Sequence, residues 1–145
     1  MSLTTTITES LTLEGSDCGS GVSITQSNVV YYLKKVIPIS ASNGGTSLYT
    51  CSSDGTSADF DYDKVKYARI TNLSATTKIY MAVKVKTGTA HYIEFVIAPL
   101  GSFIINSHNA WISNDTTISE GVVKEVRVQA ASIMGVGELF VGYEA

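Results

Sequence analysis

The sequence predicts an all-β protein: an antiparallel, jelly-roll-like β-sandwich of about eight strands. Three observations support this prediction. Apolar residues recur at every second position in several segments, which is the pattern of a strand with one buried face. Charged residues make up only 16% of the 145 residues, and the Thr, Ser, Gly, Val, Ile and Tyr that replace them favour strands and tight turns. The strand candidates recur at intervals of roughly 8–15 residues, a spacing that suggests a sandwich or jelly roll.

The chain begins with a Thr-rich segment, residues 4–13, in which Thr alternates with apolar residues. This segment is either a further strand or an extended arm. Residues 14–27 are rich in Gly and Ser, which is typical of a flexible or surface-lying stretch. We therefore divide the chain into an N-terminal arm with its Gly/Ser-rich segment (1–27) and a β-sandwich domain (28–145).

Three strand candidates follow the arm, in residues 29–39, 47–51 and 64–73. Residues 78–85 and 91–97 show the clearest alternation, because one face of each segment carries only apolar side chains. These side chains are Ile79, Met81, Val83 and Val85 in the first segment and Ile93, Phe95 and Ile97 in the second. The Gly-containing turn KTGTA joins the two segments, so they are predicted to form a hairpin.

The closing part of the sandwich contains a bend and one more pair of strand candidates. Pro99 lacks a backbone donor, so we expect residues 98–101 to bend the chain from one sheet toward the next. Asn72 tolerates turn conformations and is expected to end the strand before it. Residues 122–130 and 138–143 alternate again, and the letters MGVG between them predict the turn of a closing hairpin.

Few residues in the chain are suited to catalysis. Only His91 and His108 provide imidazole bases, and neither has a neighbouring cysteine. The chain also lacks a GxSxG nucleophile elbow. His108 and Asp115 with a serine would imitate a catalytic triad, but a triad is defined by geometry, and serine is common in this chain. We therefore expect a protein without enzymatic activity and without a cofactor.

Alternating carboxylates form the one candidate metal site. Asp59, Asp61 and Asp63 would point the same way on an extended segment and could offer oxygen ligands to a calcium ion. Lys64 stands where an EF-hand loop would need Gly. We favour the simpler interpretation, a solvated acidic turn that leads into a strand, and expect no metal.

Charge and hydropathy exclude several partners. The formal net charge is −3, and no cluster of basic residues marks a nucleic-acid surface. No apolar run approaches the ~20 residues that would span a bilayer. The N-terminus lacks the basic and apolar regions of a signal peptide, so we expect synthesis in a cytosol. Cys18 and Cys51 lack zinc-site spacing and are expected to stay thiols there.

Aromatic and apolar residues outside the expected core are the candidates for binding. Trp111 lies with Ile112 in the otherwise polar segment 106–120 and is either an interface anchor or a plug for one end of its own sandwich. The eight tyrosines form either a carbohydrate or protein contact surface or cross-strand pairs in the core. The predicted protein interface consists of Thr4, Thr6, Thr8, Leu11, Leu13, Trp111 and Ile112.

Two segments carry a resemblance to a known group of proteins. Residues 67–73, with the letters YARITNL, and residues 98–105, with APLGSFII, follow the Thr-rich start and precede a terminal ELFVGY. In this order of features the chain resembles small virion structural proteins of tailed bacteriophages over most of its length. It departs from their pattern at Ser74, where Asp is usual, and at residues 98–103, where PAGGSF is usual.

The resemblance implies a structural component of a bacteriophage particle that is assembled in the host cytoplasm and resides in the virion. Our first expectation is a capsid decoration (cement) protein that binds the major capsid protein or other virion proteins. It would form a homo-oligomer, by preference a trimer, because particle axes favour symmetric partners. One alternative is a tail, neck or fibre subunit. Another is a carbohydrate-binding β-sandwich module that uses Trp111 and tyrosines. Neither nucleic acid nor a membrane is an expected partner.

Overall fold

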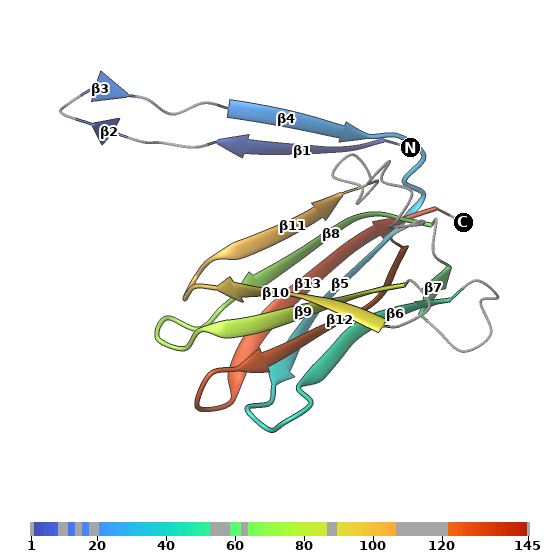
Figure 1. The fold of residues 1–145 in the computed structure, drawn as a ribbon. Coiled ribbons are helices and arrows are strands. Elements are labelled where there is room, and N and C mark those ends of the chain that lie inside the picture. The colour runs from blue at the N-terminus through green and yellow to red at the C-terminus, as the bar shows by residue number, and fades with distance from the viewer. Residues whose placement is uncertain are drawn as a thin grey trace.

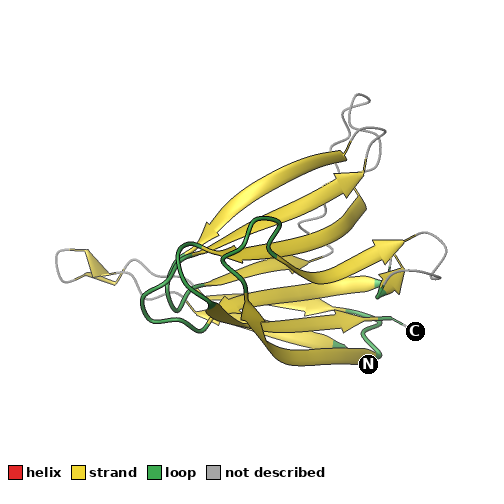
Figure 2. Ribbon diagram, turned by 90° about the horizontal axis from the view of Figure 1, so that it is seen from below, coloured by secondary structure: helices red, strands yellow, loops and turns green. Residues whose placement is uncertain are grey.

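The structure is a computed structural model and describes residues 2–8, 12–13, 16–17, 21–52, 59–61, 64–86, 90–106 and 122–144. All of the regular secondary structure within these ranges is β-strand (Figures 1 and 2). Nine strands form two sheets that pack against each other, and the four N-terminal strands form a projecting hairpin. The predicted all-β sandwich is therefore confirmed. No helix that could cross a membrane occurs in the described ranges.

The two sheets contain five and four strands. The five-stranded sheet has the order β10-β9-β12-β6-β7, with β6 (Thr46–Ser52), β7 (Phe60–Asp61), β9 (Ile79–Lys86), β10 (Ala90–Ile97) and β12 (Val122–Ala130). The four-stranded sheet has the order β11-β8-β13-β5, with β5 (Tyr31–Ile39), β8 (Val65–Asn72), β11 (Ser102–Asn106) and β13 (Gly135–Tyr143). Only β6 and β7 pair in parallel; the other neighbouring strands of the two sheets are antiparallel.

The strand pairing is that of a jelly roll. When the two-residue β7 is set aside, eight strands remain, and the first pairs with the last, β5 with β13. The second pairs with the seventh (β6 and β12), the third with the sixth (β8 and β11) and the fourth with the fifth (β9 and β10). A long antiparallel ribbon rolled up into two sheets has this order. The pairing confirms both the jelly-roll prediction and the predicted β9–β10 hairpin.

The predicted closing hairpin is wrong. β12 and β13 lie in different sheets, so residues 131–134 carry the chain across the sandwich. β13 begins at Gly135, and the two glycines that suggested a turn lie inside this strand. A Cβ atom on Gly137 would come within 2.7 Å of Cδ1 of Ile39. Close packing between strands, and not a tight turn, requires glycine at that position.

The core lies between the two sheets and follows the predicted alternation. Its fully buried side chains include Ile39, Ile70, Ile79, Met81, Val83, Val126, Val128, Leu139 and Val141. They come from strands of both sheets, as a sandwich core requires. Burying one such side chain contributes about 1.5–3 kcal/mol of hydrophobic free energy, so this layer is the main source of stability.

An N-terminal hairpin projects from the sandwich (Figure 1). Strand β1 (Leu3–Thr8) pairs with β4 (Gly21–Gln26), and β2 (Thr12–Leu13) pairs with β3 (Ser16–Asp17). The Gly/Ser-rich stretch expected after the arm therefore contains a strand. At the base of the hairpin, side-chain atoms of Leu3 and Val29 lie 3.2 Å from where a Cβ of Gly142 would be. This close approach uses a glycine of β13 to seat the hairpin on the sandwich.

Candidate binding surfaces

The residues considered for catalysis do not form a described site. His91 lies in β10 opposite Val85, whereas His108 and Asp115 lie outside the described residues. Within the described ranges, no group of three His, Cys, Asp or Glu side chains could hold a metal ion. His91 is therefore the only one of these three residues whose position the structure describes.

The acidic segment is described only in part. Asp59 is exposed, and its Oδ2 accepts hydrogen bonds from the backbone N–H of Thr50 at 2.9 Å and from the Thr50 hydroxyl at 3.3 Å. Asp61 lies in β7, and Asp63 lies outside the described residues. Cys51 is 6% exposed, whereas Cys18 is also outside the described part of the chain. The Asp59 carboxylate thus ties the start of β7 to β6.

The tyrosines divide into a packed group and an exposed group. Tyr49 and Tyr67 are each only 2% exposed. Burial raises the pKa of the Tyr49 hydroxyl above its ordinary value, and the nearby Cys51 raises it further. Tyr32, Tyr80 and Tyr92 are 70%, 48% and 49% exposed. The core interpretation therefore holds for Tyr49, which belongs to the core cluster, and the contact-surface interpretation stays a prediction for the exposed tyrosines.

Four connections meet at one end of the sandwich, which we call the loop end. They are residues 40–45, 73–78, 98–101 and 131–134, and the loop end also includes Val136 at the start of β13. Figure 1 shows them together at the lower left, far from the N- and C-termini. Backbone hydrogen bonds join neighbouring connections: Ala131 N–H donates to Lys78 O at 3.0 Å, and Leu100 N–H donates to Ser74 O at 3.1 Å. Backbone hydrogen bonds therefore hold the connections of the loop end together.

Asn72 is the internal support of the loop end. It is 0% exposed, and its amide nitrogen donates to the carbonyl oxygens of Thr77 at 2.7 Å and Ala98 at 3.1 Å. Its amide oxygen accepts from Ser74 N–H at 3.0 Å. A buried amide with its bonds satisfied favours a single arrangement of the surrounding backbone. Asn72 ends β8, as predicted from its turn preference, and also holds two connections in place.

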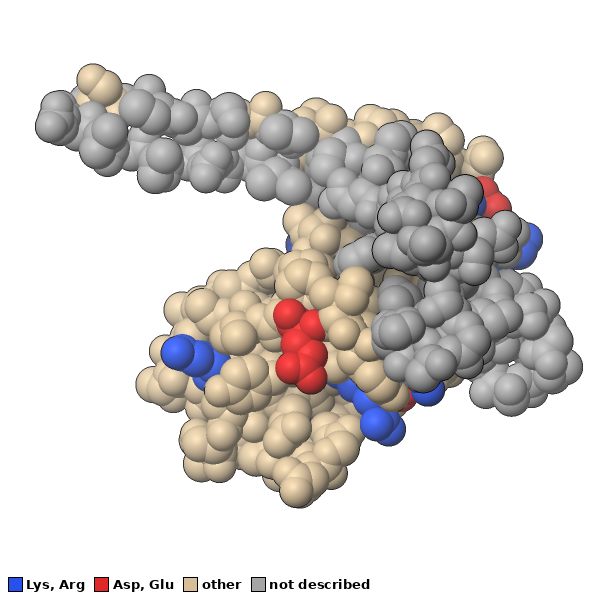
Figure 3. Space-filling model, in the orientation of Figure 1, with Lys and Arg blue, Asp and Glu red and all other residues tan. Residues whose placement is uncertain are grey.

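The surface of the loop end is almost uncharged and includes several exposed apolar side chains. Leu73, Leu100, Ile133, Met134 and Val136 are exposed by 42%, 68%, 62%, 70% and 42%. Lys78 is the only charged residue in the four connections, and the lower left of Figure 3 is correspondingly mostly tan. Scattered exposed apolar residues are normal, but a group of them at one end of a molecule marks a binding surface.

Leu100 occupies a strained position in this surface. Its φ is +58°, and Gly101 N–H donates to Ala98 O at 3.0 Å across Pro99 and Leu100. These features are those of a type II turn, whose third residue is usually Gly or Asn. A large apolar side chain at such a position costs about 1 kcal/mol or more. Nothing in the folding of the turn requires leucine there, so this exposed side chain points to a contact role.

The arm residues chosen from the sequence lie in the projecting hairpin. Thr4 and Thr6 are exposed in β1, opposite Thr25 and Ser23 of β4. Thr8 and Leu13 lie in β1 and β2. Leu11, Trp111 and Ile112 fall outside the described residues. Beyond its base, the hairpin contacts chiefly itself, because β1 and β4 pair with each other and with no strand of the sandwich.

Comparisons with known proteins do not add to this description. No protein-family model, curated protein or solved structure matches this chain.

Sequence reasoning missed the loop end. Its apolar residues lie as far apart in the sequence as Leu73 and Val136, and no connection contains more than two of them. The available signal was the turn at residues 98–101, where Leu100 stands in a position that favours Gly or Asn.

Proposed function

We propose that this chain is a structural assembly subunit that binds other protein subunits. Within that class, we propose a capsid decoration protein of a tailed bacteriophage particle, present in the virion after assembly in the host cytoplasm. The observation that carries the assembly role is the loop end, with its five exposed apolar side chains and a single charge. The resemblance of the sequence to virion structural proteins supports the narrower assignment.

A protein partner suits the chemistry of the loop end. The buried centre of a protein interface is depleted of charge, because unpaired charges are costly to desolvate. Large apolar side chains supply the association energy there. The cross-linked backbone around Asn72 fixes the surface before a partner arrives, which lowers the entropy lost on binding. We assign this surface to a capsid subunit, which presents the same apolar site at every equivalent position of a shell.

We assign the N-terminal hairpin to self-association. It is a two-stranded sheet, β1 with β4, so each strand has one edge outside the ladder. An isolated hairpin is marginally stable in water, and open strand edges readily pair with another chain. Contacts with a second and a third copy would cover these edges in a closed trimer. The Thr side chains at Thr4 and Thr6 carry no charge that such contacts would have to desolvate.

The substitution Leu100→Asn tests the loop end. Asn adopts a positive φ at little cost, so the variant should be as stable as the wild type or more stable, by less than about 1 kcal/mol. Co-sedimentation with capsid shells that lack this protein should nevertheless fall at least several-fold, because the apolar contact is lost. Val36→Asn is the matched control, since Val36 is 59% exposed but lies in β5, outside the four connections.

Two outcomes would contradict this assignment. Unchanged co-sedimentation of Leu100→Asn and of a second variant, Met134→Gln, would exclude the loop end as the capsid contact. Immunogold labelling of the source particle that decorates the tail, neck or fibres and leaves the head unlabelled would replace the decoration protein by the tail, neck or fibre alternative.

The role of the hairpin is tested by removing residues 2–26. The sandwich should still fold, because its two sheets contain no strand of the hairpin, and light scattering should change from an oligomer to a monomer. If the shortened chain unfolds, the hairpin is an intramolecular part of the fold. A monomeric wild-type chain would equally exclude self-association.

A further inference from the structure

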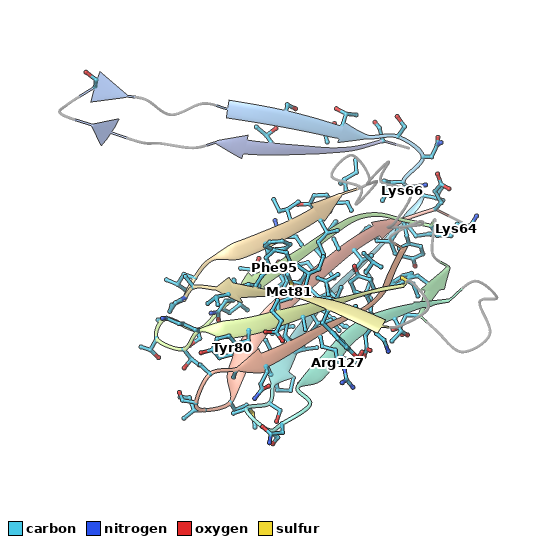
Figure 4. The ribbon with its side chains drawn as sticks, viewed as in Figure 1. Lys64, Lys66, Tyr80, Met81, Phe95 and Arg127 are labelled. Carbon is cyan, nitrogen blue, oxygen red and sulfur yellow. The ribbon has the colours of Figure 1, made fainter. Side chains whose placement is uncertain are left out.

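The outer face of the five-stranded sheet contains a hollow that is bounded at one side by Gly44 and Gly45 of the loop end. Its volume is about 680 Å³, within the roughly 300–1,000 Å³ of known small-ligand sites. The small residue Ala82 lies in its centre, between Glu94 on β10 and Arg127 on β12. Figure 4 shows Tyr80 and Arg127 from neighbouring strands of this sheet, whereas Lys64 and Lys66 lie at the other end of the sandwich.

Two tyrosines flank the centre of the hollow along the strand direction. Tyr80 precedes Ala82 by two residues, and Tyr92 pairs with Lys84, which follows Ala82 by two residues. A strand rises about 3.3 Å per residue, so the two tyrosines lie roughly 13 Å apart along the sheet. Each is about half exposed, by 48% and 49%. Lys84 Nζ lies 5.8 Å from the centre of the Tyr92 ring, which holds that lysine beside the aromatic face.

The polar groups of the hollow balance in charge. Arg127 Nε lies 2.8 Å from Glu125 Oε1, so the guanidinium charge is met by a carboxylate of its own strand. Lys84 on the same face adds a second positive charge and Glu94 a second negative one, so the formal charges of these four residues sum to zero. Gln129 is oriented by a hydrogen bond from its Nε2 to Ala41 O at 3.1 Å. The hollow therefore offers hydrogen-bonding groups without a net charge.

We propose that this hollow binds a neutral oligosaccharide. Half-exposed tyrosine rings present a flat apolar face with a polar tip, which matches the mixture of C–H and O–H groups on a sugar ring. The spacing of the two tyrosines suits a chain of several sugar units that crosses the small side chain of Ala82. Glu94, Arg127 and Gln129 are then in position to exchange hydrogen bonds with hydroxyl groups. The balanced charge favours a neutral ligand over an anionic one.

This inference goes beyond the proposed assembly role and does not depend on it. An assembly subunit that carries such a site would attach its particle to a polysaccharide surface. The loop end binds protein and the outer face of the five-stranded sheet binds glycan, so the two surfaces can be tested by different variants.

Affinity electrophoresis of the full chain through gels containing one polysaccharide each tests the proposal. The neutral probes are dextran, soluble cellulose, xylan and mannan, and alginate is the anionic probe. At least one neutral probe should retard the protein. Tyr80→Ala and Tyr92→Ala should each weaken the retardation about tenfold, since each removes one stacking ring. Tyr32→Ala is the matched control, because Tyr32 is 70% exposed on the other sheet and should leave the retardation unchanged.

Three results would overturn the proposal. The first is the absence of retardation by every neutral probe, or retardation by alginate alone. The second is an equal loss in Tyr32→Ala and Tyr80→Ala, which would place binding elsewhere. The third is a change of oligomeric state in Tyr80→Ala by light scattering, because the hollow would then be a contact between protein subunits. Ala82→Leu, which fills the centre without removing an aromatic ring, should abolish retardation while the unfolding temperature stays close to that of the wild type.

Discussion

The outer faces of the two sheets differ in how many aromatic contacts and ion pairs their side chains make with one another. On the four-stranded sheet, the ring of Phe140 is stacked on Tyr32 at 5.8 Å and meets the edge of Tyr67 at 5.9 Å. Beside it, the Glu138 carboxylate lies 3.2 Å from Lys34 Nζ and 2.8 Å from Arg69 Nη2. The guanidinium of Arg69 also lies over the Phe140 ring, at 5.9 Å. The residues of this face form one connected group.

Among the described residues of the five-stranded sheet, the contacts around the hollow are separate pairs, Arg127 with Glu125 and Lys84 with Tyr92. Tyr80 and Tyr92 lie on either side of the short side chain of Ala82 and keep about half of their surface exposed. The two faces share the same strand geometry and a similar mixture of aromatic and charged residues. On the four-stranded face, contacts within the chain join the aromatic and charged residues into one group, whereas Tyr80 and Tyr92 stand on either side of Ala82, where we propose that a glycan binds.

The largest test of this contrast is Phe140→Ala. The substitution removes the ring around which Tyr32, Tyr67 and Arg69 are arranged, and should lower the free energy of unfolding by about 2–3 kcal/mol. Urea unfolding followed by circular dichroism measures this value. A loss below about 0.5 kcal/mol would show that the four-stranded face is no more connected than the other.

Glu138→Gln should have the next largest effect. It leaves Lys34 and Arg69 without their shared carboxylate, and the part-buried position of Glu138 makes the pair more valuable than a fully exposed one, at about 1 kcal/mol. The matched control is Glu94→Gln on the five-stranded face, which should change stability by less than about 0.5 kcal/mol. Equal effects of the two substitutions would remove the electrostatic part of the contrast.

The contribution of the Glu138 carboxylate to stability should depend on pH. The hydrogen bond from Lys34 is the main cause that lowers the pKa of Glu138 in the folded chain from its ordinary 4.5, and Arg69 contributes as well. Because the folded pKa is the lower one, the stabilisation is complete above pH 4.5 and is lost as the pH falls through the folded pKa. The stability difference between wild type and Glu138→Gln should therefore shrink between pH 5 and pH 3. A difference that stays constant over this range would contradict the assignment.

Tyr80→Ala should have the smallest effect on stability. Its ring is half exposed, so removing it should change the free energy of unfolding by less than about 0.5 kcal/mol, although it lies in a β-strand. Differential scanning calorimetry of this variant beside Phe140→Ala compares the two faces directly. If Tyr80→Ala destabilises the protein as much as Phe140→Ala does, the Tyr80 ring supports the fold, which would contradict its proposed role in ligand binding.

The sequence by itself determined most of the strands and the sandwich class. Alternation at Ile79, Met81 and Val83 is a local property, since neighbouring side chains on a strand point to opposite faces whatever pairs with it. The bend at residues 98–101 and the strand end at Asn72 were predicted for the same reason, because Pro and Asn act on their own backbone. Strand β11 was not among the predicted strands, since its five residues follow a bend and give too short a pattern.

Only the tertiary structure decided the strand pairing beyond the β9–β10 hairpin, and which surfaces result. Gly135 and Gly137 predicted a turn, yet they lie in β13 against Ile39, because a glycine that permits a turn also permits close packing. The loop end joins Leu100 and Met134, and the hollow joins Ala82 and Arg127, across long stretches of sequence. Burial of one apolar face against the other sheet selects these partners, and that free energy depends on the whole sandwich and on no single segment.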